Sequence, residues 1–178
     1  MSSGRSGVVF VKSEGTAVPV ARSKAELERM LRRYGAERFS VAEEYTTGRV
    51  VVMFTIPDTP DAGAKTVDVR FPIETRRVYD RLFGRPTKRV WKDAAARYVD
   101  EFDPKGYDPK RLEQAERVAW RNVILWTDAQ LSAASVGIQT VTEAFIAHAA
   151  LGPNGERLID VLPALLDPRR MLGAGGDE

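Results

Sequence analysis

The stretch between Glu74 and Lys92 has the residue types and spacing that best suit a chemical task. It holds seven basic residues and two acidic ones, a net charge of +5. The basic residues are Arg76, Arg77, Arg81, Arg85, Lys88, Arg89 and Lys92. Such side chains neutralise phosphates, and Tyr79, Phe83 and Trp91 in the same stretch have rings that stack on unpaired bases. We therefore predict that the protein contacts DNA or RNA through these seven basic residues.

The charge of the rest of the chain strengthens this contrast. The whole sequence carries a net charge of +2, whereas residues 93–178 carry nine basic and fourteen acidic residues, a net charge of −5. A charge asymmetry of this kind points to a polyanionic partner. The competing interpretation is that Val78, Leu82 and Trp91 are core residues. The basic side chains would then form a solvated helix face, balanced by the acidic C-terminal half or by a neighbouring subunit.

Carboxylates near the expected strand ends raise a second, catalytic alternative. The order helix, strand, strand, strand, helix resembles the core of the restriction-endonuclease-like nucleases, which hold a metal ion with acidic residues on two adjacent strands. Asp58 and Asp68, with Glu44 nearby, would be the corresponding carboxylates for a magnesium ion that activates water. However, Asp58 falls at the end of its strand. Arg70 also stands where those enzymes have a lysine, and arginine does not release its proton as lysine can.

The remaining sequence contains no complete catalytic signature, so a non-catalytic protein without a cofactor is the favoured expectation. The chain has no cysteine and a single histidine, His148, which together do not form a usual zinc site. His148 lies on the apolar side of an expected helix and is predicted to face the core or a partner. The glycine-rich GAGGDE end follows no strand and lacks the lysine of a phosphate-binding loop.

Alternating apolar residues predict three strands that would support these side chains. The segments 39–45 and 50–56 alternate with period two around Thr47 and Gly48, which indicates a hairpin, and 67–73 alternates in the same way. All three share one strongly apolar face. A three-stranded sheet needs helices to cover such a face, because it would not be stable alone.

Two helices are predicted to provide this cover. The first spans 24–34, with Ser23 and Glu26 as a capping box and Gly35 as its end. The second is the long central helix 109–136, with Asp108 as N-cap, proline at its first position and Gly137 as its end. Two neighbouring apolar stripes along this second helix predict that it is the central core element.

The basic stretch and the C-terminal part are expected to be helical as well. Short helices are predicted at 75–83 and 87–100, and Thr140 with Glu143 forms a second capping box at the start of another helix. The predicted fold class is α+β: a three-stranded antiparallel sheet with helices on one face and a helical C-terminal half built on the long central helix. The predicted organisation is a flexible N-terminus at 1–17, one domain at 18–166 and a flexible tail at 167–178.

The composition also suggests where the protein acts. The first residues contain an apolar run far shorter than that of a signal peptide, and no segment approaches the roughly 18 apolar residues of a membrane span. The absence of cysteine fits a reducing compartment. We expect a cytoplasmic protein that is not secreted and does not contact membranes. A large apolar surface at Trp120 and Trp126 would suit a homo-oligomer.

The central helix and the segment after it resemble a family of small phage and prophage proteins of unassigned function. The matching features are Trp120-Arg121, Leu131, the Gly137-Ile138 turn, the helix start at 142–145 and the turn at 152–155. These phage proteins also resemble the chain in its N-terminal segment VPVARSKAELERMLRRYGAERF. The resemblance spans roughly residues 18–162. It implies a phage-related accessory protein that acts in the host cell, and it implies no activity. A protein-interaction, anti-host or structural oligomerising role is the alternative to nucleic-acid binding.

Overall fold

The computed structural model describes residues 13–44, 49–58, 65–93, 97–151 and 156–165. The chain divides into two compact units, the first made of Met1–Glu26 with Ile73–Leu125 and the second of Leu27–Pro72 with Trp126–Glu178. Helices α1 (Val20–Arg33) and α3 (Pro109–Ser135) contribute residues to both units. The tail predicted at 167–178 and most of the N-terminal segment predicted at 1–17 lie outside the described residues. The single domain predicted over 18–166 stays a prediction.

The predicted three-stranded antiparallel sheet is confirmed, and all of it except Ile73 belongs to the second unit. Its strands are β1 (Arg38–Glu44), β2 (Arg49–Pro57) and β3 (Thr66–Ile73), with β2 in the middle. Along β2, buried residues alternate with half-buried ones, because successive side chains of a strand point to opposite faces. This alternation is the pattern from which the strands were predicted.

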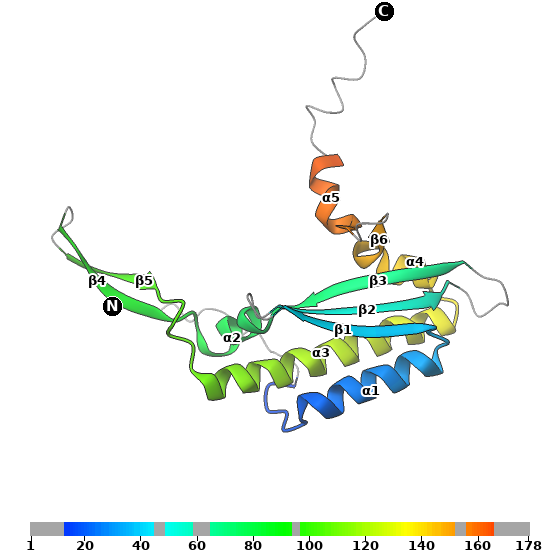
Figure 1. Ribbon diagram of the computed structural model, residues 1–178, viewed down its shortest axis with the longest axis horizontal. Helices are drawn as coiled ribbons and strands as arrows, with labels where there is room; N and C mark the ends of the chain where they lie inside the picture. Colours follow the sequence, from blue (N-terminus) through cyan, green and yellow to red (C-terminus); the bar gives the residue numbers. More distant parts are fainter. Residues whose placement is uncertain (1–12, 45–48, 59–64, 94–96, 152–155, 166–178) are drawn as a thin grey trace, which may run out of the picture. The chain divides into compact units, whose positions relative to one another are not determined.

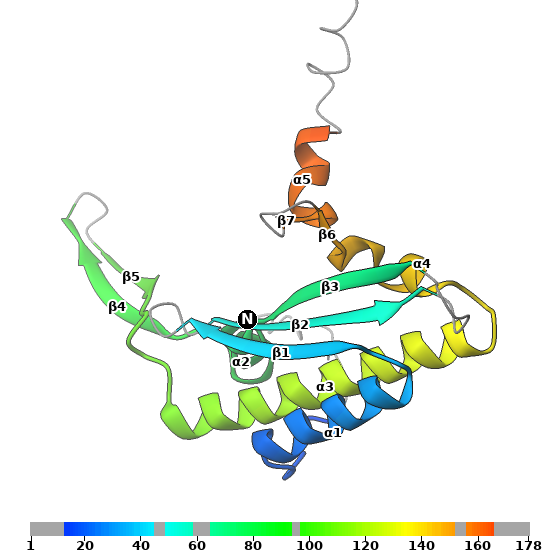
Figure 2. The same cartoon turned by 45° about the vertical axis from the view of Figure 1, so that its right-hand side comes forward.

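The core of the second unit lies on one face of this sheet. Phe54 is 2% exposed, and its ring meets those of Phe71 and Phe145 edge to face, with centroids 6.2 Å and 5.5 Å apart. The parts of α1 and α3 that belong to this unit cover the same face (Figures 1 and 2), and they bury Leu31 and Leu131. Helices therefore cover the apolar face, as the sequence predicts.

Both glycines expected to end a helix do so. Gly137 has a φ of 75°, and the amides of Gly137 and Ile138 donate to the carbonyls of Ala134 and Ala133. This pair of bonds satisfies carbonyls that the end of α3 would leave free, and it requires the left-handed backbone that glycine adopts without strain. Gly35, with a φ of 86°, ends α1 in the same way. The start of α3 is also as predicted, because the Asp108 carboxylate accepts the amide of Arg111 at 2.8 Å.

The capping box predicted at Ser23 is wrong. α1 already begins at Val20, so Ser23 lies inside the helix, fully buried, and its hydroxyl has no hydrogen-bond partner among the described residues. Glu26 does not fold back onto the helix start. Its carboxylate instead accepts two hydrogen bonds from the guanidinium of Arg121, each 2.9 Å long. This contact with α3 joins residues 95 positions apart, which a local pattern does not reveal.

The prediction of a helix at 87–100 is also wrong, whereas the helix predicted at 75–83 is confirmed as α2 (Thr75–Phe83). Residues 87–102 form an antiparallel hairpin of β4 (Thr87–Lys92) and β5 (Arg97–Phe102). Branched and aromatic residues, which favour strands, pair across it: Val90 stands opposite Val99, and Trp91 opposite Tyr98. These pairs form only when the two segments meet, so the helical spacing within 87–100 was misleading.

The C-terminal part adds short elements to the predicted helices. α4 (Val141–Phe145) begins with the predicted capping box, and the 3-10 helix η2 (Ile146–His148) follows. β6 (Ala150–Leu151) pairs with β7 (Glu156–Arg157), and α5 (Leu158–Leu165) comes last. Ala149 forms an antiparallel bridge with Val69 of β3, which places this segment beside the sheet. No helix in the described part of the chain is long and apolar enough to span a membrane.

The two tryptophans of α3 are largely buried inside their units. Trp120 is fully buried in the first unit. Trp126 is half-buried in the second, where its ring packs edge to face against Phe71 and Phe145. The large apolar surface predicted at these two residues is therefore mostly internal. A homo-oligomer stays a prediction that needs another surface.

His148 faces the core, as the sequence suggests. Its ring lies edge to face with Phe71 and Trp126, at centroid distances of 6.0 Å and 5.5 Å, and its Nδ1 is buried without a hydrogen-bond partner among the described residues. Burial lowers the pKa of His148 from its ordinary value of 6.5. The positive charge of Arg157 lowers this pKa further, and the carboxylate of Asp160 raises it. The folded protein therefore holds His148 neutral at a pH where the unfolded chain takes up a proton.

We expect the free energy of unfolding to fall as the pH drops below about 6.5, because the unfolded state then binds a proton that the folded state still excludes. A His148→Phe variant keeps an aromatic ring in this place but cannot titrate. Urea unfolding of both proteins between pH 7.5 and 5.5 would measure the effect. The native protein should lose more stability over this window than the variant, and equal losses would contradict the assignment.

Candidate nucleic-acid interface

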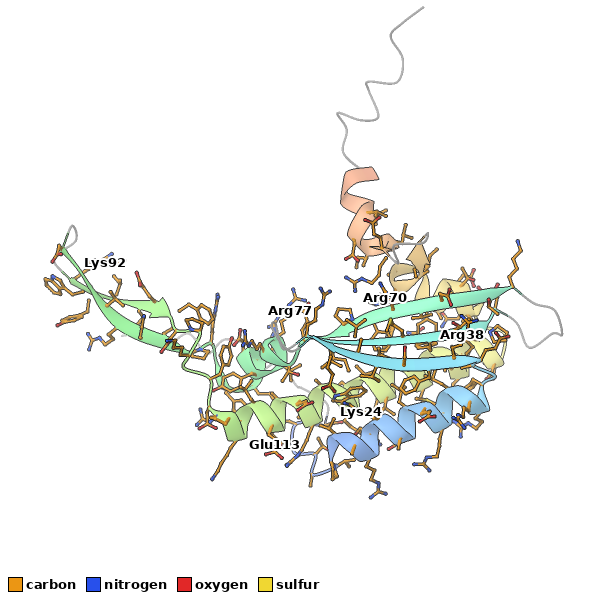
Figure 3. The ribbon with its side chains drawn as sticks, in the orientation of Figure 1. Lys24, Arg38, Arg70, Arg77, Lys92 and Glu113 are labelled. Atoms are coloured by element: carbon orange, nitrogen blue, oxygen red, sulfur yellow. The ribbon has the colours of Figure 1, made fainter. Side chains whose placement is uncertain are left out.

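Three of the seven predicted basic residues lie on α2, in the first unit. Arg77 forms an ion pair with Glu74 at 3.0 Å, and the guanidinium of Arg76 lies 5.4 Å from the centre of the Tyr107 ring. Arg81 is exposed, in the last turn of the helix. Figure 3 labels Arg77 on this helix. The helix thus presents arginines to solvent, but one of them is already balanced by a neighbouring carboxylate.

The other four basic residues lie on or beside β4. Because side chains alternate along a strand, the β4–β5 hairpin has two faces. One face, which we call the aromatic face, consists of Thr87, Arg89, Trp91, Tyr98, Asp100 and Phe102. The opposite face consists of Lys88, Val90, Lys92, Arg97, Val99 and Glu101. The basic residues of β4, which are predicted to act as one group, are therefore divided between two surfaces of the hairpin.

The aromatic face exposes three large rings. Trp91, Tyr98 and Phe102 are 47%, 58% and 38% exposed. The rings of Trp91 and Tyr98 meet with centroids 5.0 Å apart, and the indole N–H of Trp91 donates to Asp93 at 2.7 Å. Since the indole donor has a partner within the chain, the open ring surface of Trp91 is apolar.

Arginines lie over two of these rings. The guanidinium of Arg89 is 5.2 Å from the centre of the Tyr98 ring, and that of Arg85 is 4.0 Å from the centre of the Phe102 ring. A cation above an aromatic face is attracted by the negative charge density of the ring. The contacts hold both positive charges beside the exposed rings. Cation and ring therefore alternate along this surface.

Carboxylates of β5 balance part of the basic charge of β4. Lys92, which Figure 3 labels, forms an ion pair with Glu101. The hydrogen bond from Lys92 and its charge lower the pKa of the Glu101 carboxyl, and the charge of Lys88 adds to this effect. Asp100 stands opposite Arg89 in the register. The formal charge of +5 between Glu74 and Lys92 therefore overstates the positive charge that α2 and the hairpin together offer a polyanion.

A cluster of rings joins the hairpin to α2. Tyr79 is buried and packs edge to face on Phe83 and Tyr107, with centroids 5.2 Å and 4.9 Å apart. The Tyr107 hydroxyl donates to Asp80 at 3.2 Å, and burial together with the nearby Asp80 charge raises the pKa of this tyrosine. Tyr79 is thus unavailable for stacking, contrary to the sequence prediction. The exposed Phe83 and Trp91 remain available.

Tyr98 and Phe102 are exposed rings that are not among the residues predicted to stack on bases. Tyr98 and Phe102 stand an even number of positions apart, which places both rings on one face of a strand, and this signal could have indicated a strand with one aromatic face. The prediction of a helix over 87–100 concealed it. The competing interpretation of Trp91 as a core residue is wrong, because nearly half of its surface is exposed.

The carboxylates of the nuclease alternative make structural contacts in the second unit. Asp58 accepts the amide of Thr142 at 2.7 Å, at the start of α4. Asp68 accepts the Thr55 hydroxyl at 2.5 Å across the sheet. The side chain of Glu44 lies outside the described residues. Among the described residues, no three or more histidine, cysteine, aspartate or glutamate side chains are grouped so that they could hold a metal ion.

No protein-family model matches this chain, and neither a curated protein nor a solved structure matches it. The function is therefore argued from the geometry of the described residues.

Proposed function

We propose that this protein binds nucleic acid without catalysis, with unpaired bases stacking on the aromatic face of the β4–β5 hairpin. The observation that carries the proposal is the exposed ring pair of Trp91 and Tyr98 with Arg89 beside it. Exposed aromatic rings are costly to a soluble surface unless they serve a contact. Rings interleaved with cations suit a single strand, which offers both bases and phosphates.

The same observation favours single strands over duplexes. In a duplex the bases are already stacked on one another, so exposed rings gain little by approaching them. On the aromatic face, Asp100 stands opposite Arg89 and partly balances its charge, which weakens an interaction with phosphates alone. Stacking contributes about 1–3 kcal/mol for each base and does not depend on the net charge. Phosphate contacts would come from Arg81, Arg85 and Arg89.

A protein-interaction role is the second candidate, and the same exposed rings favour it. A strand pair with apolar rings on one face can also pack on the apolar surface of a partner protein. Such a complex would not require the phosphate contacts. A phage-related role for either activity rests on the resemblance of residues 18–162 to phage proteins and belongs to this proposal.

The test is fluorescence anisotropy with labelled single- and double-stranded DNA and RNA at two salt concentrations, with and without magnesium. We expect single strands to bind more tightly, with an affinity that falls as salt rises. Changing Arg81, Arg85 and Arg89 to alanine should reduce the logarithmic salt dependence by roughly 0.7 for each phosphate that is no longer neutralised. Arg38→Ala, on β1, is the control and should change nothing.

Two results would contradict the proposal. The absence of any binding at low salt would exclude nucleic acid as the partner and favour the protein-interaction role. Cleavage of the labelled strand in the presence of magnesium would show that the protein is catalytic. It would favour the nuclease alternative, in which Asp58 and Asp68 hold the metal ion.

A further inference from the structure

A hollow of about 310 Å³ lies on the sheet face that points away from the core, in the second unit. Its lining comes from all three strands of the sheet, from β7 and from α5. The lining residues are Ala42, Arg49, Val51, Met53, Arg70, Pro72, Arg157 and Asp160. On β2 these residues alternate with the buried Val50, Val52 and Phe54, which places the hollow opposite the core.

Backbone contacts place the C-terminal segment at this hollow. Ala149 forms its bridge with Val69 of β3, and the carbonyl of Ala149 accepts the amide of Leu158 at 3.2 Å. The start of α5 is thereby held beside the edge strand. Arg157 and Asp160 consequently line the same hollow as Arg70, which Figure 3 labels on β3.

Two of the charged groups of the hollow, Arg157 and Asp160, are held in place by a bidentate contact. Arg157 donates from Nε and Nη2 to the two oxygens of Asp160, at 2.7 Å and 2.5 Å, and its side chain is only 13% exposed. The hydrogen bond from Arg157 lowers the pKa of the Asp160 carboxyl, and the charges of Arg157 and Arg49 act in the same direction. Asp160 thus stays ionised and orients Arg157. Three guanidinium groups and one carboxylate among the lining residues leave a positive balance.

The remaining lining is apolar. Val51, Met53 and Pro72 are half-buried and lie between the arginines. A guanidinium group presents parallel donors that match two oxygens of a phosphate, and it remains charged at every physiological pH. The volume is at the small end of ligand-binding pockets. It suits a phosphate with a small organic group attached.

We propose that this hollow binds a phosphate group through Arg49 and Arg70, with Asp160 holding Arg157 in position and Val51, Met53 and Pro72 contacting the organic part of the ligand. This site goes beyond the nucleic-acid contact proposed above, because all of its residues lie in the second unit and none belongs to the hairpin. The phosphate has two conceivable sources, a small phosphorylated molecule or the backbone of a nucleic acid.

Isothermal titration calorimetry with the full chain tests the site, using inorganic phosphate, adenosine 5′-monophosphate and uncharged adenosine as probes. We expect the monophosphate to bind most tightly and adenosine not to bind. Arg70→Gln should weaken monophosphate binding roughly tenfold or more, because it removes a charge-assisted contact. Arg38→Gln, on the same sheet but outside the hollow, should leave binding unchanged.

A second variant, Arg49→Gln, protects the test against a folding defect at one position, and thermal unfolding of each variant checks that the sheet is intact. Displacement of the monophosphate by an unphosphorylated single-stranded oligonucleotide would assign the phosphate to a nucleic-acid backbone, and no displacement would assign it to a small molecule. No saturable binding of any phosphate, or equal effects of Arg70→Gln and Arg38→Gln, would overturn the proposal. Either result would leave the nucleic-acid contact proposed for the hairpin unaffected, because no residue of the hairpin lines the hollow.

Discussion

Replacing Trp91 and Tyr98 together by alanine is expected to weaken the binding of a single-stranded oligonucleotide by about 30-fold or more. The two rings are 47% and 58% exposed and meet edge to face with centroids 5.0 Å apart, so each ring offers its own surface to a base. Each base that loses its stacking partner costs about 1 kcal/mol at the least, and two such losses correspond to this factor. Anisotropy at one fixed salt concentration measures the change.

The hairpin offers its own matched control. Val90 and Val99 stand opposite each other on the other face of the same two strands. Their replacement by alanine should leave the affinity within about twofold while removing a comparable cross-strand pair. Circular dichroism of both double variants would check that the strands still form. Equal losses in the two variants would show that the hairpin acts through its stability and would contradict stacking on the aromatic face.

Replacing Phe54 by alanine is expected to reduce the free energy of unfolding by about 3–5 kcal/mol, the usual cost of removing a buried phenyl ring. Phe54 is 2% exposed and lies between Phe71 and Phe145, so its loss removes two edge-to-face contacts and leaves a cavity behind β2. Since the free energy of unfolding of such domains is only about 5–15 kcal/mol, the variant would lose a large part of it. Urea unfolding followed by fluorescence would measure it.

Val136→Ala provides the control within the same unit. This side chain is 71% exposed just after α3, and its truncation should change stability by less than about 0.5 kcal/mol. A loss of less than about 1 kcal/mol for Phe54→Ala would mean that the sheet and its covering helices can repack around the cavity. That result would contradict a core centred on this residue.

Much of the fold could be predicted because its signals are local. The alternation in β2 and the glycines at positions 35 and 137 each act within a few residues. The same holds for Asp108 at the start of α3 and for the pair of Thr140 and Glu143 at the start of α4. A cap or a strand face depends on neighbours that are close along the chain, so the amino-acid order carries the information directly.

The errors arose where a residue has a distant partner. Glu26 has the spacing of a capping residue, but it binds Arg121 instead. The 87–100 segment has helical spacing, yet pairs such as Val90 with Val99 and Trp91 with Tyr98 make it a hairpin. Tertiary contacts override weak local preferences because several cross-strand pairs together outweigh a difference in propensity of about a few tenths of a kcal/mol for each residue.

The sequence by itself thus determined the three-stranded sheet, the long helix, most helix ends and the basic character of Glu74 to Lys92. Only the tertiary structure decided how the charges and rings of that stretch are used. β5 brought Glu101 against Lys92 and brought Tyr98 and Phe102 to the face that carries Trp91. The folded chain also placed Arg157 beside Arg49 and Arg70 around one hollow. Composition counts charges, but the pairing of strands determines which of them face one another, and a binding surface depends on that arrangement.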